Sequence, residues 1–178
     1  MKKSFPFIFL IASTILALNA CKKEEASKPA GDFMISKLDG EPFGTKDQTD
    51  TAYALLDTIS SPEKLYITSR MTSWTLSISI YDQSDYTGTF RFGNEVPGFF
   101  YHFAVITRVP GRYNEDSWFS NGDAISGDHS RGTVTIDRFD TVKHRIEGTY
   151  EGTFYNPNTG TTKVITDGKF SLPLTTLR

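Results

Sequence analysis

The most regular alternation of apolar and polar residues in the chain runs from Ile146 to Phe154. Every second residue from Ile146 is glycine or a large apolar residue, and the residues between them are Glu or Thr. A period of two places one set of side chains on the buried face of a β-strand and the other set on the exposed face. We therefore predict a central strand here, with Tyr150 buried and Thr149 exposed.

Shorter segments with the same period predict further strands along the chain. From Trp74 to Tyr81, aromatic or aliphatic residues alternate with Thr and Ser, which a helix would scatter around its axis. Residues 33–38 and the segment from Pro42 flank Asp39-Gly40, a strong signal for a two-residue hairpin turn. Residues 161–166 follow a cluster of turn residues and predict a strand after the central one.

These segments predict an all-β fold. We expect an antiparallel β-sandwich of about nine or ten short strands, because short strands separated by turn residues are typical of that class. The alternative is a partly open, lipocalin-like β-barrel. Small residues on the buried side of the central strand, Gly148 and Gly152, favour a bend and suit either arrangement.

The segment from Pro110 to Arg131 is the longest one without strand alternation, and it contains several aromatic residues. Aromatic rings with neighbouring amides and carboxylates are suited to binding a sugar or a peptide. The candidate ligand-binding residues are Tyr113, Asn114, Asp116, Trp118 and Phe119. The alternative is that the segment folds over an open end of the sheet and closes it. An exposed Trp118 would favour the binding site, and a buried Trp118 would favour the lid.

The first 20 residues have the composition of an export signal. A basic head at residues 1–3 precedes a run of 14 residues without charge, from Phe5 to Leu18. This run is shorter than the roughly 20 residues that a membrane-spanning helix needs. The run leads to Cys21, the only cysteine, so an internal disulfide is excluded.

Leu18-Asn19-Ala20-Cys21 resembles the lipobox of bacterial lipoproteins. The resemblance implies cleavage before Cys21, a diacylglycerol on its thiol, and usually a fatty acid on the new amino group. Two or more acyl chains anchor a protein stably, whereas one chain holds it reversibly. The alternative is an ordinary signal peptide that is followed by an incidental cysteine.

Residues 22–31 lack large apolar side chains and predict a disordered tether. The four charged residues after Cys21 resemble the surface-export signal of Bacteroidota lipoproteins, and the alternative is a merely solvated linker. The chain thus divides into a lipoprotein signal peptide (1–20), a tether (21–31) and a single all-β domain (32–178). We expect an outer-membrane lipoprotein that faces either the cell surface, as the charged residues after Cys21 favour, or the periplasm.

Four segments of the domain have recognisable motifs, namely GTVTIDRFD, HRIEGTYEGTF, ITDGKFSL and FMISKLDGEPFGT. The first three resemble the patterns GxVxITxFD, IxGTF and ITDGxF of a family of Bacteroidota lipoproteins of unknown function, and the fourth resembles the opening hairpin of that family. The family carries no established activity, so the resemblance implies no catalytic residue.

The composition adds exclusions. The net charge is −2, which gives no reason to expect nucleic acid as a partner. No spacing of Ser, His and Asp marks a catalytic set, so we expect no enzyme and no cofactor. The acidic residues between 115 and 128 do not follow a calcium-loop pattern, so no metal site is expected. His102, among aromatics, is expected in the core, and His144 in a solvated turn.

These observations predict a non-catalytic binding or adhesion module that is held to the membrane through the lipid on Cys21 and binds a glycan or a protein. The alternative is a structural or scaffold subunit of an envelope complex without a small ligand.

Overall fold

The computed structural model describes residues 31–45, 50–81, 85–93, 95–96, 100–110, 115–120 and 130–178. These residues form strands, turns and bends, and no helix occurs among them. In this part of the chain no helix is therefore long and apolar enough to cross a membrane. The predicted all-β class is confirmed.

The described residues contain thirteen strands, more than the nine or ten expected. In chain order they are β1 (Phe33–Leu38), β2 (Glu41–Gly44), β3 (Thr51–Asp57), β4 (Lys64–Arg70), β5 (Trp74–Tyr81), β6 (Gly88–Arg91), β7 (Glu95–Val96), β8 (Phe100–Tyr101), β9 (Phe103–Arg108), β10 (Ser117–Ser120), β11 (Arg131–Asp140), β12 (Arg145–Asn156) and β13 (Thr161–Leu177). β7 and β8 form a separate two-stranded sheet, and the other eleven belong to one sheet.

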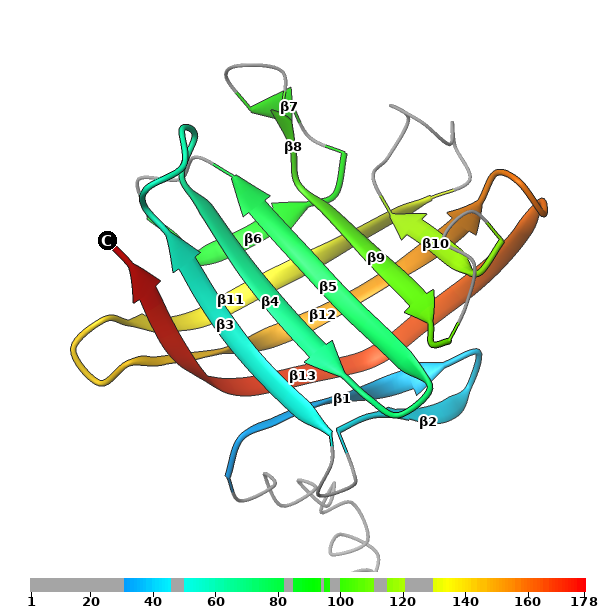
Figure 1. Cartoon of the computed structure of the whole chain (residues 1–178), viewed down its shortest axis with the longest axis horizontal. Helices are drawn as coiled ribbons and strands as arrows, with labels where there is room; N and C mark the ends of the chain where they lie inside the picture. The colour runs from blue at the N-terminus through cyan, green and yellow to red at the C-terminus, as the bar shows by residue number, and fades with distance from the viewer. Residues whose placement is uncertain are drawn as a thin grey trace, which may run out of the picture. The chain divides into compact units, whose positions relative to one another are not determined.

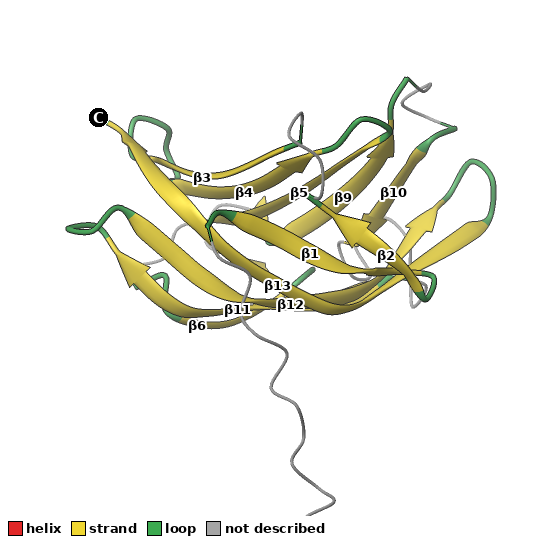
Figure 2. Cartoon of the chain, turned by 90° about the horizontal axis from the view of Figure 1, so that it is seen from below, coloured by secondary structure: helices red, strands yellow, loops and turns green. Residues whose placement is uncertain are grey.

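The main sheet folds into two layers (Figures 1 and 2). One layer contains β3, β4, β5, β9 and β10, and the other contains β13, β12, β11 and β6, with β1 and β2 continuing from β13. The layers are joined at both sides, because β13 pairs with β3 and β12 pairs with β10. Strands β13, β3, β4, β5, β9, β10 and β12 close into a ring, so the fold combines the two layers of the expected sandwich with the closure of the alternative barrel.

The sheet is mixed rather than purely antiparallel. Leu174 to Leu177, at the end of β13, pair in parallel with Ala54 to Asp57 of β3. The strand predicted at residues 161–166 continues to Leu177 as one 17-residue strand, β13, whose register shifts opposite Tyr150 and Gly152. A strand of this length pairs with strands of both layers. Its parallel partner is about 120 residues earlier in the chain, so no local sequence pattern predicts that pairing.

The central position of β12 is confirmed. It pairs with β13 along one side and with β11 and β10 along the other. Tyr150 is buried, with 4% of its surface exposed, whereas Thr149 is exposed. Gly148 lies where a Cβ would fall 2.7 Å from Cζ of Phe170 and too close to the Thr135 carbonyl oxygen. The alternating faces follow the sequence pattern, because the core needs the apolar side chains of β12.

The core fills the space between the layers. Leu76, Ile78 and Ile80 of β5 are fully buried and face residues of the other layer such as Ile146 and Phe154.

The turn predicted at Asp39-Gly40 is present, with positive φ at both residues. The sequence predicts that the segment 110–131 is irregular, but it contains the strand β10. This strand is not visible in the sequence, because it is only four residues long and its composition is mixed.

Candidate functional site

Trp118 lies in β10 and closes a corner of the sandwich. Only 8% of its surface is exposed, and its indole Nε1–H donates to Thr161 Oγ1 at 2.9 Å. Its ring lies 5.9 Å from that of Trp74, and Phe43 packs edge-on against Trp74 at 6.2 Å. The three rings come from β10, β5 and β2, so they join both layers. For Trp118, the structure therefore agrees with the lid rather than with an exposed binding patch.

Lys163 completes this corner. Its Nζ lies 5.0 Å from the centre of the Trp118 ring and 5.5 Å from that of Trp74, within cation–π range. The same ammonium forms an ion pair with Asp39 at 3.0 Å. A cation from the protein itself lies against both indole rings, which further favours a structural role for Trp118.

Of the remaining candidate ligand residues, the structure describes Asp116 and Phe119. Tyr113 and Asn114 lie outside the described residues. Phe119 is half-buried, and its backbone pairs with Tyr155. Asp116 borders a hollow of about 600 Å³, together with Ser73, Trp74, Arg108, Val109 and Pro110.

His102 and His144 lie where the sequence predicts, the first in the core and the second in an exposed turn. His102 is buried, with 4% of its surface exposed, and its Nδ1 accepts a hydrogen bond from the Tyr81 backbone N–H at 3.2 Å. Burial lowers the pKa of His102, which favours the neutral ring. His144 is exposed in the turn between β11 and β12.

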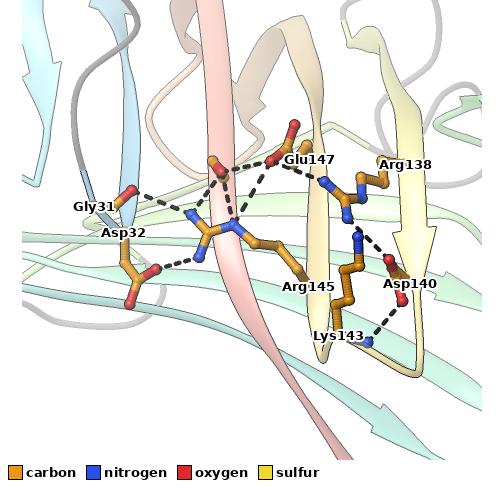
Figure 3. Close-up of polar contacts among 8 residues, drawn as sticks. Gly31, Asp32, Arg138, Asp140, Lys143, Arg145 and Glu147 are labelled. Carbon is orange, nitrogen blue, oxygen red and sulfur yellow. Dashed lines mark hydrogen bonds and ion pairs between the residues drawn. The ribbon is translucent and has the colours of Figure 1, made fainter.

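A polar network fastens the start of the domain to β12 and β13 (Figure 3). Arg145 Nη1 pairs with Asp32 at 2.8 Å, and its Nη2 donates to the Gly31 carbonyl and, at 2.7 Å, to Ser171 Oγ. Ser171 in turn donates to Glu147 at 3.2 Å. The first described residues are thereby held against strands more than 110 residues later in the chain.

The same network continues into the β11–β12 turn (Figure 3). Asp140 accepts the Lys143 backbone N–H at 2.7 Å and the Arg138 guanidinium at 2.9 Å. These two contacts lower the pKa of the Asp140 carboxyl. The network satisfies its own charges, so it is a structural clamp rather than a ligand site.

An open groove of about 550 Å³ lies elsewhere, over β6, β11, β12 and β13. Strand register explains its form, because outward-pointing residues line up in two rows across the strands. One row is Arg91, Thr133 and Glu151, and the other is Arg131, Thr153 and Val164. Arg91, Arg131, Glu151 and Val164 are exposed, which places the groove on the outer face.

The floor of the groove is the row between these two. Gly132 pairs with Gly152, Gly152 pairs with Ile165, and the Phe92 backbone N–H donates to the Gly132 carbonyl. Side chains in this row point inward, so the outer face presents mainly backbone there. Rows two residues apart along a strand are separated by about 7 Å. The long Arg and Glu side chains therefore form walls above a low floor.

Sequence reasoning missed this groove. Arg91 and Arg131 are 40 positions apart, and each has the ordinary appearance of a solvated charge next to a turn. Only the register of β6 against β11 brings them to the same groove. The alternation of β12 did predict that Glu151 and Thr153 would face outward.

Within the described residues, no group of three or more His, Cys, Asp or Glu side chains is arranged to hold a metal ion. Comparison with known proteins gives no relative: no protein-family model, no curated protein and no solved structure matches the chain.

Proposed function

We propose that this protein is an outer-membrane lipoprotein, anchored through lipid on Cys21, whose β domain is a non-catalytic binding module. The proposal joins two features. The lipobox-like Leu18–Cys21 segment and the polar tether 22–31 supply attachment and reach. The groove over β6, β11, β12 and β13 supplies a surface on which a ligand can bind.

The observation that carries the binding role is the combination of an open groove with exposed arginines that form no ion pair among the described residues. The ion pairs among the described residues include neither Arg91 nor Arg131. In contrast, Arg138 of β11 and Arg145 of β12 are both ion-paired. Rigid strands hold the groove residues, which favours a preformed site over one that folds on binding.

The attachment is tested with a Cys21→Ser variant. Cells that express the chain are labelled with a fatty-acid probe and fractionated into membrane and soluble parts. We expect the wild-type chain to carry the label and to remain with membranes, and the variant to lose both properties. A variant that is still labelled and still in the membrane fraction would contradict anchoring through Cys21.

The binding role is tested by blocking the groove. The full chain, purified in detergent, is applied to an array of neutral and acidic glycans, and hits are measured in solution. Thr153→Trp places an indole in the groove and should abolish binding of any ligand that the groove holds. Thr149→Trp adds the same ring to the exposed face of β12 outside the groove and is the matched control. Equal binding by both variants would place the ligand elsewhere.

A scaffold role without a small ligand is the second candidate. The burial of Trp118 favours it, because this aromatic residue of the 110–131 segment packs against Trp74. In that case no glycan binds, and crosslinking in intact cells captures an envelope protein equally well with wild type and Thr153→Trp.

A further inference from the structure

Arg91 and Arg131 stand at diagonal positions on neighbouring strands. Arg91 of β6 lies directly opposite Thr133 of β11, and Arg131 is two residues before Thr133. Diagonal neighbours in an antiparallel pair are about 7–8 Å apart, which is less than the combined reach of two arginine side chains. Both guanidinium groups can therefore reach one anion above the groove.

The two positive charges lack compensation in the described part of the protein. Glu151 lies in the same row as Arg91, across Thr133, yet neither arginine forms an ion pair with it. Two neighbouring cations repel each other unless an anion lies between them. Guanidinium groups bind carboxylate and sulfate oxygens through paired, charge-assisted hydrogen bonds. An oxyanion is thus the ligand group that this end of the groove is suited to bind.

The rest of the groove is suited to hydroxyl groups. Thr133, Thr153 and Thr166 line it with side-chain hydroxyls that donate and accept hydrogen bonds. Glu151 offers carboxylate oxygens that accept from a ligand hydroxyl. The groove runs across four strands, which is long enough for several sugar rings at a spacing of about 4.8 Å per strand. This lining favours a polyhydroxylated chain over an apolar or a purely ionic ligand.

We propose that the groove binds an acidic saccharide, with a carboxylate or sulfate between Arg91 and Arg131 and sugar hydroxyls along the threonines. This inference rests on the proposed binding function and specifies its ligand class. Arg91 and Arg131 would bind the negative group of the sugar at one end of the groove, and the threonine side chains line the groove from there toward β13.

The test measures affinities of the full chain in detergent by calorimetry. The probes are a galacturonic acid hexasaccharide, its methyl-esterified neutral form, a sulfated hexasaccharide and a hexapeptide of glutamate. We expect the acidic saccharides to bind, the methyl ester to bind at least tenfold more weakly, and the glutamate peptide to bind weakly. The affinities of the galacturonic acid hexasaccharide and the sulfated hexasaccharide show whether the groove prefers carboxylate or sulfate.

Charge variants then locate the anion. Arg91→Gln and Arg131→Gln should each weaken binding of the preferred acidic saccharide about tenfold, as expected for a lost charge-assisted hydrogen bond. Glu151→Gln should tighten it by a few-fold, because a negative charge is removed from the groove. Lys169→Gln removes one positive charge from an exposed site on β13 outside the groove and should change affinity little.

The outcomes separate this inference from the function on which it rests. Equal affinity for the acidic hexasaccharide and its methyl ester, or equal losses in Arg91→Gln, Arg131→Gln and Lys169→Gln, would overturn the acidic ligand. If a neutral glycan binds and Thr153→Trp abolishes that binding, the groove is still the binding site, but its ligand is not acidic. Tight binding of the glutamate peptide would replace the saccharide with an acidic protein segment.

Discussion

Trp118 donates a 2.9 Å hydrogen bond to Thr161, although 43 positions separate the two residues. The bond ties the short strand β10 to the first residue of β13, next to the place where Phe119 of β10 pairs with Tyr155 of β12. Loss of the acceptor would leave a largely buried N–H without a partner.

We therefore predict that Thr161→Val lowers the free energy of unfolding by about 1–2 kcal/mol, since a buried donor loses its hydrogen bond. The neighbouring Thr162→Val, at an exposed position, should change it by less than about 0.5 kcal/mol. Urea melts followed by tryptophan fluorescence measure both. Equal changes would show that the Trp118 contact contributes nothing to stability.

The second prediction concerns glycines on the buried side of β12. A Cβ at Gly148 would collide with the Thr135 carbonyl and the Phe170 ring, whereas a Cβ at Gly152 would come no closer than 3.1 Å to its neighbours. We expect Gly148→Ala to destabilise the fold by about 1–3 kcal/mol through overpacking, and more than Gly152→Ala does. Thermal melts of the two variants compare them, and the reverse order would contradict the close packing of β11 and β12.

The third prediction tests the central position of β12. Tyr150→Ala removes a buried ring and should cost about 3–5 kcal/mol, a large part of the stability of a domain of this size. Thr149→Ala, on the exposed face, should cost no more than about 0.5–1 kcal/mol. Small and equal losses in urea melts would mean that β12 is peripheral.

The fourth prediction concerns pH. The pKa of His102 in the folded state lies below its ordinary value of 6.5, so the unfolded chain binds a proton more readily. The contribution of His102 to stability is therefore complete above pH 6.5 and is lost as the pH falls from there through the lowered folded-state pKa. In His102→Gln this part of the pH dependence should disappear. Urea melts between pH 8 and pH 5 compare the slopes, and parallel curves would refute the assignment.

The fifth prediction concerns the network at the start of the domain. Arg145→Gln removes the pairing with Asp32 and weakens the contact with Gly31, so the beginning of β1 should open more easily. We expect amide hydrogen exchange at Phe33 and Met34 to accelerate about tenfold, as for the loss of about 1.4 kcal/mol of local stability. Arg138→Gln, which leaves Asp32 and Gly31 paired, is the control. Unchanged exchange in Arg145→Gln would show that the network does not hold the N-terminal strand.

Some features were determined by the sequence itself. The period of two in β12 and β5 fixed their strands and the side of each that is buried, because the pleat alternates side chains whatever the partner strand is. The Asp39-Gly40 turn was equally local, since positive φ at two successive residues is a property of the dipeptide. The burial of His102 followed from the aromatic residues around it in the chain.

Other features were decided by the tertiary structure alone. The parallel pairing of Leu174–Leu177 with β3, the full length of β13, and the ring that joins the layers all depend on contacts between distant segments. The burial of Trp118 depends on Trp74 and Lys163, which no local pattern connects to it. The groove arises in the same way, because Arg91 and Arg131 become neighbours only through the register of β6 against β11. Alternation in a sequence states which face a side chain takes, whereas register between strands decides which side chains share that face.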